Sequence, residues 1–365
     1  MEEKVREVTS GDRMKLTEIY QEYKWEEINQ RMEKFLSGNE TGFLSLTEEI
    51  MKGNYNGLLD TIKQVFLKNL QIEWREIRQF LAVVVFVVFL SSFLKILKNS
   101  FKNKQIAEIA YYTNYMILMI LFTKIYENIT LICESTLTEL ESFMKIFFPA
   151  YFLLVGTSSG IKTGLLYFQL SGLVIYFIEK VLLTIILPLL NFYLLFIFIN
   201  GIWEEDRWNL VLRYMKKGIG IAFKLMIAAI TGIGFVQSML IPVLESLKKE
   251  GIYHLLDMIP GVGGMAKGTF RMWLASAVIV KNSVGILGCV MILFIAIVPL
   301  IKIGVILAGM KISTAFLSII ADKKIVSCMN EVGNGIYLCF QTTGYGILFF
   351  LILIAITSYS SSGGI

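Results

Sequence analysis

Long stretches without a charged residue constrain this chain more than any other feature. Residues 181–203, 225–244 and 282–301 contain no Asp, Glu, Lys or Arg, and residues 332–365 contain none up to the last position. An uncharged apolar stretch of about 20 residues crosses the roughly 30 Å hydrocarbon core as a helix, because hydrocarbon offers the backbone amides no other hydrogen-bond partner. These stretches predict membrane spans, with a kink in the first where Pro188 removes a backbone hydrogen bond.

Weaker apolar stretches raise the expected number of spans to about eight. Residues 80–97 form the first span, and residues 109–122 form a shorter second one, extended by tyrosines such as Tyr126 that favour the membrane interface. Residues 146–161 and 163–178 are short, and they predict either a tight helical hairpin or a re-entrant pair. The expected fold class is all-α: a polytopic integral membrane helical bundle, with some segments re-entrant, and a small helical polar N-terminal domain.

Charge divides the chain into two domains. Residues 1–78 carry a charge every few positions and form a polar helical domain, whereas residues 79–365 form the multi-spanning domain. The lysines from Lys95 to Lys104 follow the first span, which places that end in the cytoplasm and the N-terminal domain outside. The basic stretch 245–281 fits this orientation poorly. Because no apolar segment precedes residue 80, export requires a removed signal peptide or translocation by the first span; otherwise the orientation is inverted.

Three glycines, Gly156, Gly160 and Gly164, recur at a four-residue step. This spacing aligns small residues on one helix face and lets another backbone approach, so we predict helix packing rather than a pore lining. The same stretch is not a phosphate-binding loop, because Ile161 separates the last glycine from Lys162 and no strand precedes it.

Several ionisable residues lie within or beside the expected spans. Glu108, Lys224 and Lys302 are candidates for an intramembrane polar site, because a charge at bilayer depth needs a partner or water. Lys224 either places the surrounding helix turns at the membrane interface or faces a polar cavity. Lys145 and Glu179 are expected to reach toward the headgroups, with an interior ion pair as the alternative.

A cluster of helix-breaking residues, Pro260, Gly261, Gly263 and Gly264, interrupts the second half of the chain. The following apolar segment, residues 272–280, is too short to span a bilayer, and we expect it to be re-entrant or interfacial. Lys281 and Asn282 would then open the next span.

The sequence contains no catalytic or metal-binding motif, and we therefore expect no enzyme activity, no cofactor and no metal. His254 is the only histidine, and its surface placement is favoured over a general-base role. The four cysteines are scattered without disulfide or zinc spacing. A net charge of +5, with no basic stripe, indicates contact with a membrane surface rather than nucleic acid.

Separated motifs in the second half resemble the stage III sporulation protein AE family. They occur in the family's order over about residues 217–364, with compatible hydropathy back to residue 80. The motifs are Ile259–Gly264, Ser276–Gly288, Pro299–Ile303 and Glu331–Gly335. The residues carried over from them, as structural rather than catalytic, are Pro260, Gly261, Gly263, Gly264, Lys281, Asn282, Gly285, Gly333 and Asn334.

The resemblance implies a sporulation function. Members of this family are expected in the mother-cell membrane that faces the forespore, as multi-pass subunits of a trans-envelope channel complex needed for late forespore development. It implies partners from the same operon, including ring-forming proteins and an ATPase, and it is compatible with homo-oligomers. A small-molecule permease is the competing interpretation, because broken helices at glycines form substrate sites in transporters.

Overall fold

A computed structural model of the chain describes residues 82–90, 104–159, 161–202, 208–257, 263–319 and 321–360, and the single positions Leu67, Gln71, Arg75, Arg78 and Phe93. All regular elements in these residues are helices, which confirms the predicted all-α class. Apart from four single positions, the predicted N-terminal domain lies outside the described residues, as do Pro260 and Gly261.

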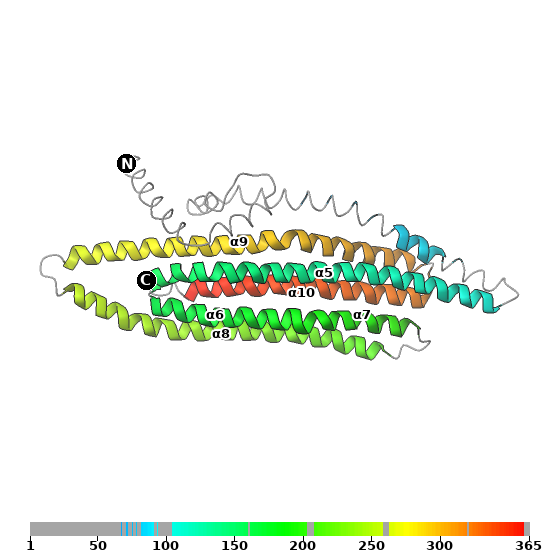
Figure 1. Cartoon of the computed structure of the whole chain (residues 1–365), viewed down its shortest axis with the longest axis horizontal. Helices are drawn as coiled ribbons and strands as arrows, with labels where there is room; N and C mark the ends of the chain where they lie inside the picture. Colours follow the sequence, from blue (N-terminus) through cyan, green and yellow to red (C-terminus); the bar gives the residue numbers. More distant parts are fainter. Residues whose placement is uncertain are drawn as a thin grey trace.

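The helices form one elongated antiparallel bundle (Figure 1). Their bounds are α5 Lys104–Ser159, α6 Ile161–Glu179, the π-helix η1 Lys180–Ile186, α7 Leu187–Ile202, α8 Asn209–Asp257, α9 Gly263–Leu317 and α10 Lys323–Ser360. Helices α5 and α10 run through the centre, with α9 along one side and α6, α7 and α8 along the other. The 56 residues of α5 extend about 84 Å at 1.5 Å per residue. Because the hydrocarbon core is only about 30 Å thick, part of this helix must lie outside it.

Five helical stretches in the described residues are long and apolar enough to span a membrane, so the expected count of eight is not confirmed. The expected span 109–122 and residues 146–159 of the next one both belong to α5, because residues 123–141 contain no Pro or Gly and remain helical between them. The expected spans 163–178 and 181–203 likewise merge into the continuous run of α6, η1 and α7. The candidate spans are Tyr115–Gly156, Phe168–Gly201, Asn209–Val236, Val278–Leu317 and Lys323–Ser358.

One further expectation about helix boundaries is wrong, whereas the expected interruption near Pro260–Gly264 agrees with two separate helices on either side of it. Residues 272–280 are neither re-entrant nor a separate segment, because α9 continues from Gly263 through Lys281 to Leu317. Gly263 and Gly264 are the first two residues of this helix, whereas α8 ends at Asp257. Glycine is tolerated at a helix start, where backbone N–H groups have no partner within the helix in any case.

The chain stays helical from α6 through Pro188 into α7 because the backbone hydrogen-bond pattern changes just before the proline. Residues Lys180–Ile186 are π-helical, and the backbone N–H of Leu187 donates to the carbonyl of Leu182, five residues earlier. Proline lacks an N–H, and one-turn π segments are a common accommodation at such positions. The expected disturbance at Pro188 therefore takes the form of a π-helical turn that keeps α6 and α7 in one run.

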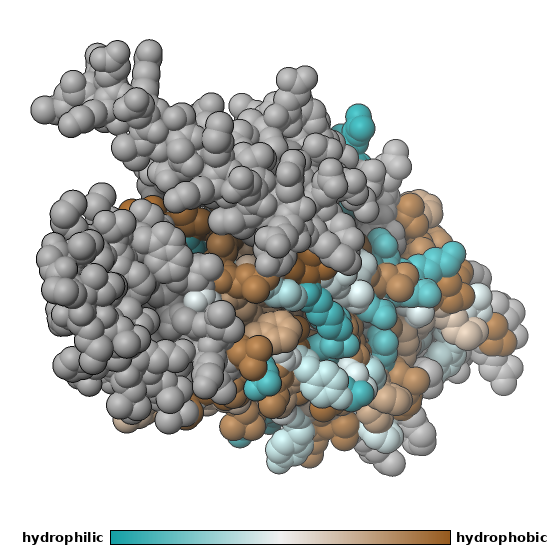
Figure 2. All heavy atoms as spheres, turned by 60° about the vertical axis from the view of Figure 1, so that its left-hand side comes forward, coloured by the Kyte–Doolittle hydropathy of each residue, from teal (hydrophilic) through white to brown (hydrophobic). Residues whose placement is uncertain are grey.

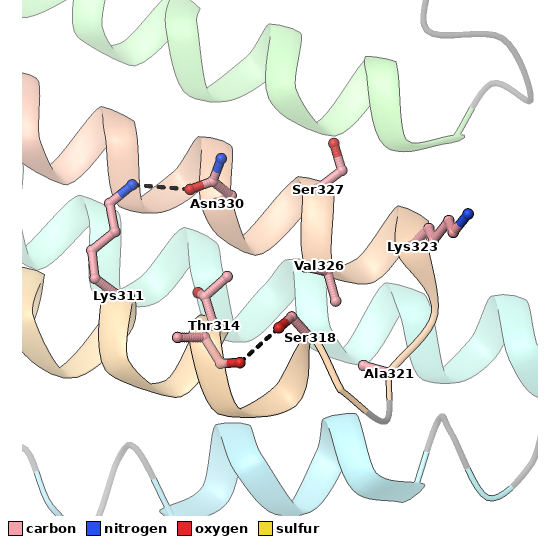
Figure 3. A pocket seen from close by; sticks show the side chains of 9 residues that line it. Lys311, Thr314, Ser318, Ala321, Lys323, Val326, Ser327 and Asn330 are labelled. Carbon is pink, nitrogen blue, oxygen red and sulfur yellow. Dashed lines mark hydrogen bonds between the residues drawn. The ribbon is translucent and has the colours of Figure 1, made fainter.

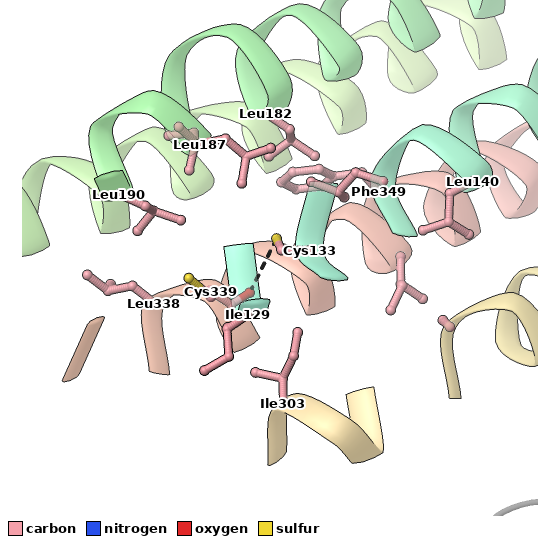
Figure 4. Close-up of a cluster of buried hydrophobic side chains, with 14 of the residues drawn as sticks. Ile129, Cys133, Leu140, Leu182, Leu187, Leu190, Ile303, Leu338, Cys339 and Phe349 are labelled. Atoms are coloured by element: carbon pink, nitrogen blue, oxygen red, sulfur yellow. Dashed lines mark hydrogen bonds between the residues drawn. The ribbon is translucent and has the colours of Figure 1, made fainter. Parts of the chain in front are cut away.

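Large apolar side chains fill the centre of the bundle. Figure 4 shows Ile129 and Cys133 of α5 meeting Leu190 of α7, Ile303 of α9 and Leu338 of α10. The hydroxyl of Thr343 lies 3.1 Å from the Cys133 sulfur, so the polar atoms in this region pair among themselves. The core also contains fully buried aromatic rings, including Tyr126, which was expected at the interface. Its hydroxyl instead donates to the Leu190 carbonyl at 2.9 Å.

Apolar side chains also cover much of the outer surface (Figure 2). Phe86, Phe192 and Leu225 are more than half exposed on three different parts of the chain. Large apolar side chains are exposed in this way along each of the long helices α5 to α10. The outer face of these helices therefore suits lipid.

Candidate polar site inside the bundle

The carboxylate of Glu331 is the centre of a polar network between helices. Helix α10 directs Glu331 toward α7 and α8, where the Tyr193 hydroxyl donates to its Oε2 atom at 2.6 Å. The Lys216 ammonium from α8 lies 2.7 Å from the same oxygen. The Lys216 nitrogen is also 5.7 Å from the centre of the Tyr193 ring, within the range of a cation–π contact. One carboxylate thus joins three helices.

Asn334 extends this network to the fourth helix. It lies one turn after Glu331, where residues i and i+3 share a helix face, and its Nδ2 donates to Glu331 Oε1 at 3.3 Å. The Lys311 ammonium of α9 donates to Asn334 Oδ1 at 2.7 Å and to Asn330 Oδ1 at 3.0 Å. The predicted motif residue Asn334 is therefore a bridge between α9 and α10.

The two glycines of the same motif make room for this arrangement. A Cβ atom at Gly333 would lie 3.2 Å from Cε of Lys311, and one at Gly335 would lie 2.7 Å from the Tyr126 ring. The second distance is shorter than real Cβ atoms show. The motif therefore has two parts. Glu331 and Asn334 supply the polar side chains, and Gly333 and Gly335 let the neighbouring helices come close enough to contact them.

The network contains two ammonium groups and one carboxylate. The side chains of Lys216 and Glu331 are 32% and 20% exposed, so water screens their pair only in part. Removing one member of a buried ion pair is costly because the remaining charge stays desolvated. We therefore assign Glu331 a structural role: it holds the helices together. Its carboxylate has protein partners and needs no bound substrate to pair with.

A second polar contact closes the far end of the bundle. Lys281 is fully buried in α9, and its ammonium lies 3.4 Å from the Ser358 carbonyl in the last turn of α10. A lysine is favoured there because helix C-termini carry partial negative charge. The Ser358 hydroxyl donates to Asn282 Oδ1 at 3.3 Å, and a Cβ atom at Gly285 would lie 3.0 Å from the Tyr151 hydroxyl. The structure thus brings Lys281, Asn282 and Gly285 together at one contact among α5, α9 and α10.

A third cluster joins α5 to α6. The Lys145 ammonium pairs with Glu141 on its own helix and with Glu179 Oε2 at 3.3 Å. The Lys145 side chain is 57% exposed, whereas that of Glu141 is 9% exposed. These residues form an ion pair at the surface of the hairpin, so Lys145 and Glu179 are paired as the alternative required, but not in the interior of the bundle.

We expect this surface pair to contribute little to stability. Replacing Glu179 with glutamine should change the free energy of unfolding by less than about 1 kcal/mol, because exposed ion pairs are screened and lose side-chain entropy. A double-mutant cycle with Lys145→Gln, followed by denaturant titration in detergent, measures the coupling. A coupling energy above about 2 kcal/mol would contradict the surface assignment of this pair.

The other predicted site residues do not come together. Lys224 is exposed on α8, and Lys302 is half-buried on α9. Helix α5 ends at Ser159 and α6 begins at Ile161, so Gly156 and Gly164 belong to different helices and do not share one helix face. His254 lies in α8, but its side chain, that of Glu108 and the position of Gly160 lie outside what the structure describes.

Sequence reasoning missed Tyr193, Lys216, Lys311 and Glu331 as site residues. Lys216 lies within α8 and Lys311 within α9. One usable signal was the single acid that immediately precedes the uncharged stretch 332–365, since such a residue needs a partner. Among the described residues, no group of three His, Cys, Asp or Glu side chains could hold a metal ion.

Five long apolar helices held together by internal polar contacts define an all-α membrane protein. The chain belongs to the stage III sporulation protein AE family, whose sequence model matches residues 42–361. It is 19% identical over 278 residues to the stage III sporulation protein AE of Bacillus subtilis (strain 168), covering 76% of this chain and 70% of that protein. No solved structure matches the chain.

The family membership confirms the resemblance derived from the motifs and extends it. The matched region begins at residue 42, within the predicted N-terminal domain, where the sequence motifs indicated no likeness. Membership in this family implies a role in sporulation.

Proposed function

We propose that this chain is a multi-pass subunit of a trans-envelope complex that links mother cell and forespore. It would lie in the mother-cell membrane facing the forespore, with residues 1–78 outside the cytoplasm, and serve late forespore development as a scaffold or pore component. The observation that carries this proposal is the family match along residues 42–361. Its partners would be other stage III proteins, including ring-forming proteins and an ATPase.

Packing inside the bundle favours a scaffold, or a pore wall shared by several chains. The described part of the centre is filled by large side chains such as Phe147, Tyr193 and Phe349, all less than 2% exposed. In the described part of the bundle, this filled centre argues against a water-filled path through one chain. A path for solutes would therefore run between copies of this chain or between it and its partners.

The permease alternative depends on the helix break at Pro260–Gly264 and on Lys224, which is exposed on α8. The filled centre of the bundle favours the scaffold over a permease that would carry a solute through one chain.

Co-purification tests the proposal. The full chain, tagged and expressed in an endospore-forming host that lacks its own family member, should restore spore formation and recover other stage III proteins from sporulating cells. Recovery of none of them, together with solute uptake by liposomes that contain this chain alone, would contradict the scaffold and support the permease. A tagged unrelated polytopic membrane protein serves as the matched control for nonspecific recovery.

A further inference from the structure

A cavity opens between the end of α9 and the start of α10. It has a volume of about 440 Å³, and Figure 3 shows Thr314 from α9 and Ser318 from the turn after it below Ser327 and Asn330 from α10. Lys311 stands at one end of the cavity, where it donates to Asn330 of the lining, and it joins the Glu331 network through its hydrogen bond to Asn334. At the opposite end lies the turn that leads into α10.

The lining of this cavity favours an anion. Lys311 and Lys323 both line it, and no carboxylate does. The nearby Asp322 instead accepts a hydrogen bond from the backbone N–H of Lys324 at 2.9 Å, as a cap of its own helix. The Thr314 and Ser318 hydroxyls of the lining donate to backbone carbonyls, which leaves the Ser327 hydroxyl and the Asn330 amide as the neutral groups that can donate to phosphate oxygens. The cavity therefore combines two positive charges with neutral hydrogen-bonding groups.

An apolar stripe runs along α9 beside the cavity. Ile312, Phe316 and Ile319 are 50%, 70% and 82% exposed, and their spacing of four and three residues places them on one side of the helix end. The cavity residues Lys311, Thr314 and Ser318 occupy the adjacent side. A ligand that fills both features needs an anionic group and a long apolar part.

We propose that this cavity binds the phosphate headgroup of an acidic phospholipid, with its acyl chains along the Ile312–Ile319 stripe. Basic pockets between membrane helices are typical sites for acidic lipid headgroups. Free phosphate shares the headgroup chemistry but would leave the apolar stripe unused. The lipid would brace the α9–α10 hairpin next to the Glu331 network.

Lipid titration of the full chain tests this site. The detergent-purified protein is titrated separately with short-chain phosphatidylglycerol, short-chain phosphatidylcholine and inorganic phosphate. We expect phosphatidylglycerol to bind most tightly, and Lys323→Gln to weaken its binding about fivefold, because one basic residue near a membrane surface contributes about that factor. Lys324→Gln is the matched control: it removes the same charge one position away, outside the cavity lining.

Three results would overturn the proposal. Equal binding of phosphatidylglycerol and phosphatidylcholine would show that the charge does not select the lipid. Equal losses in Lys323→Gln and Lys324→Gln would reduce the effect to general surface charge. Inorganic phosphate that binds as tightly as phosphatidylglycerol would assign the cavity to a free anion. Circular dichroism of both variants verifies that each is folded before it is titrated.

Discussion

Replacing Glu331 with alanine lowers the free energy of unfolding by about 1–3 kcal/mol and reduces spore formation. Loss of one partner of a fully buried ion pair costs about 3–5 kcal/mol, and the partial exposure of Lys216 and Glu331 reduces that cost. The substitution also leaves the Tyr193 hydroxyl without its acceptor. Denaturant titration of the purified protein measures the stability, and spore counts measure the function.

A second substitution distinguishes the ion pair from simple packing. Adding Lys216→Met to Glu331→Ala should restore part of the lost stability, because the uncompensated ammonium is gone. Glu134→Ala, an exposed carboxylate on α5, is the control and should change the free energy of unfolding by less than about 0.5 kcal/mol. If Glu331→Ala behaves like this control, Glu331 does not lock the helices together.

Two glycines of α10 should respond to alanine with opposite signs. Gly335→Ala should destabilise the protein by about 1–2 kcal/mol, because the new Cβ atom lies 2.7 Å from the Tyr126 ring and overpacking outweighs the gain in helix propensity. The ring cannot move away freely, since its hydroxyl is bound to the Leu190 carbonyl. Spore formation should fall in parallel.

Gly344→Ala is the matched substitution nine residues along the same helix. No atom lies within 4 Å of a Cβ atom at this position, so the change should stabilise the protein by up to about 1 kcal/mol through helix propensity alone. Both free energies come from denaturant titration in the same detergent. A stabilising Gly335→Ala would show that α7 and α5 do not approach α10 as closely as the structure indicates.

Polar contacts and close packing at small residues determine how these helices associate. Lipid gives helices little hydrophobic reason to associate, because acyl chains are as apolar as leucine. Polar contacts and close packing at small residues must then determine which helices meet. The Glu331 network supplies the polar contacts, and Gly335 supplies the close packing. Both belong to the five-residue motif Glu331–Gly335.

The sequence by itself determined the class of the fold. Uncharged stretches such as 282–301 and 332–365 can only be helices in hydrocarbon, since their amides have no other partner there. The motif around Glu331–Gly335 was also visible in the sequence, together with the family that it indicates. Hydropathy alone misplaced the boundaries, because it divided α5 at Glu127–Glu141, where the backbone stays helical.

Only the tertiary structure decided which charges belong together. Lys216, Lys311 and Glu331 are separated by at least 20 positions, and nothing in the spacing of the chain relates them. They meet because the antiparallel helices α8, α9 and α10 bring the three residues to the same level of the bundle, beside Tyr193 of α7. A charge pattern along one helix shows that a residue needs a partner, whereas the packing of the helices against each other selects the partner.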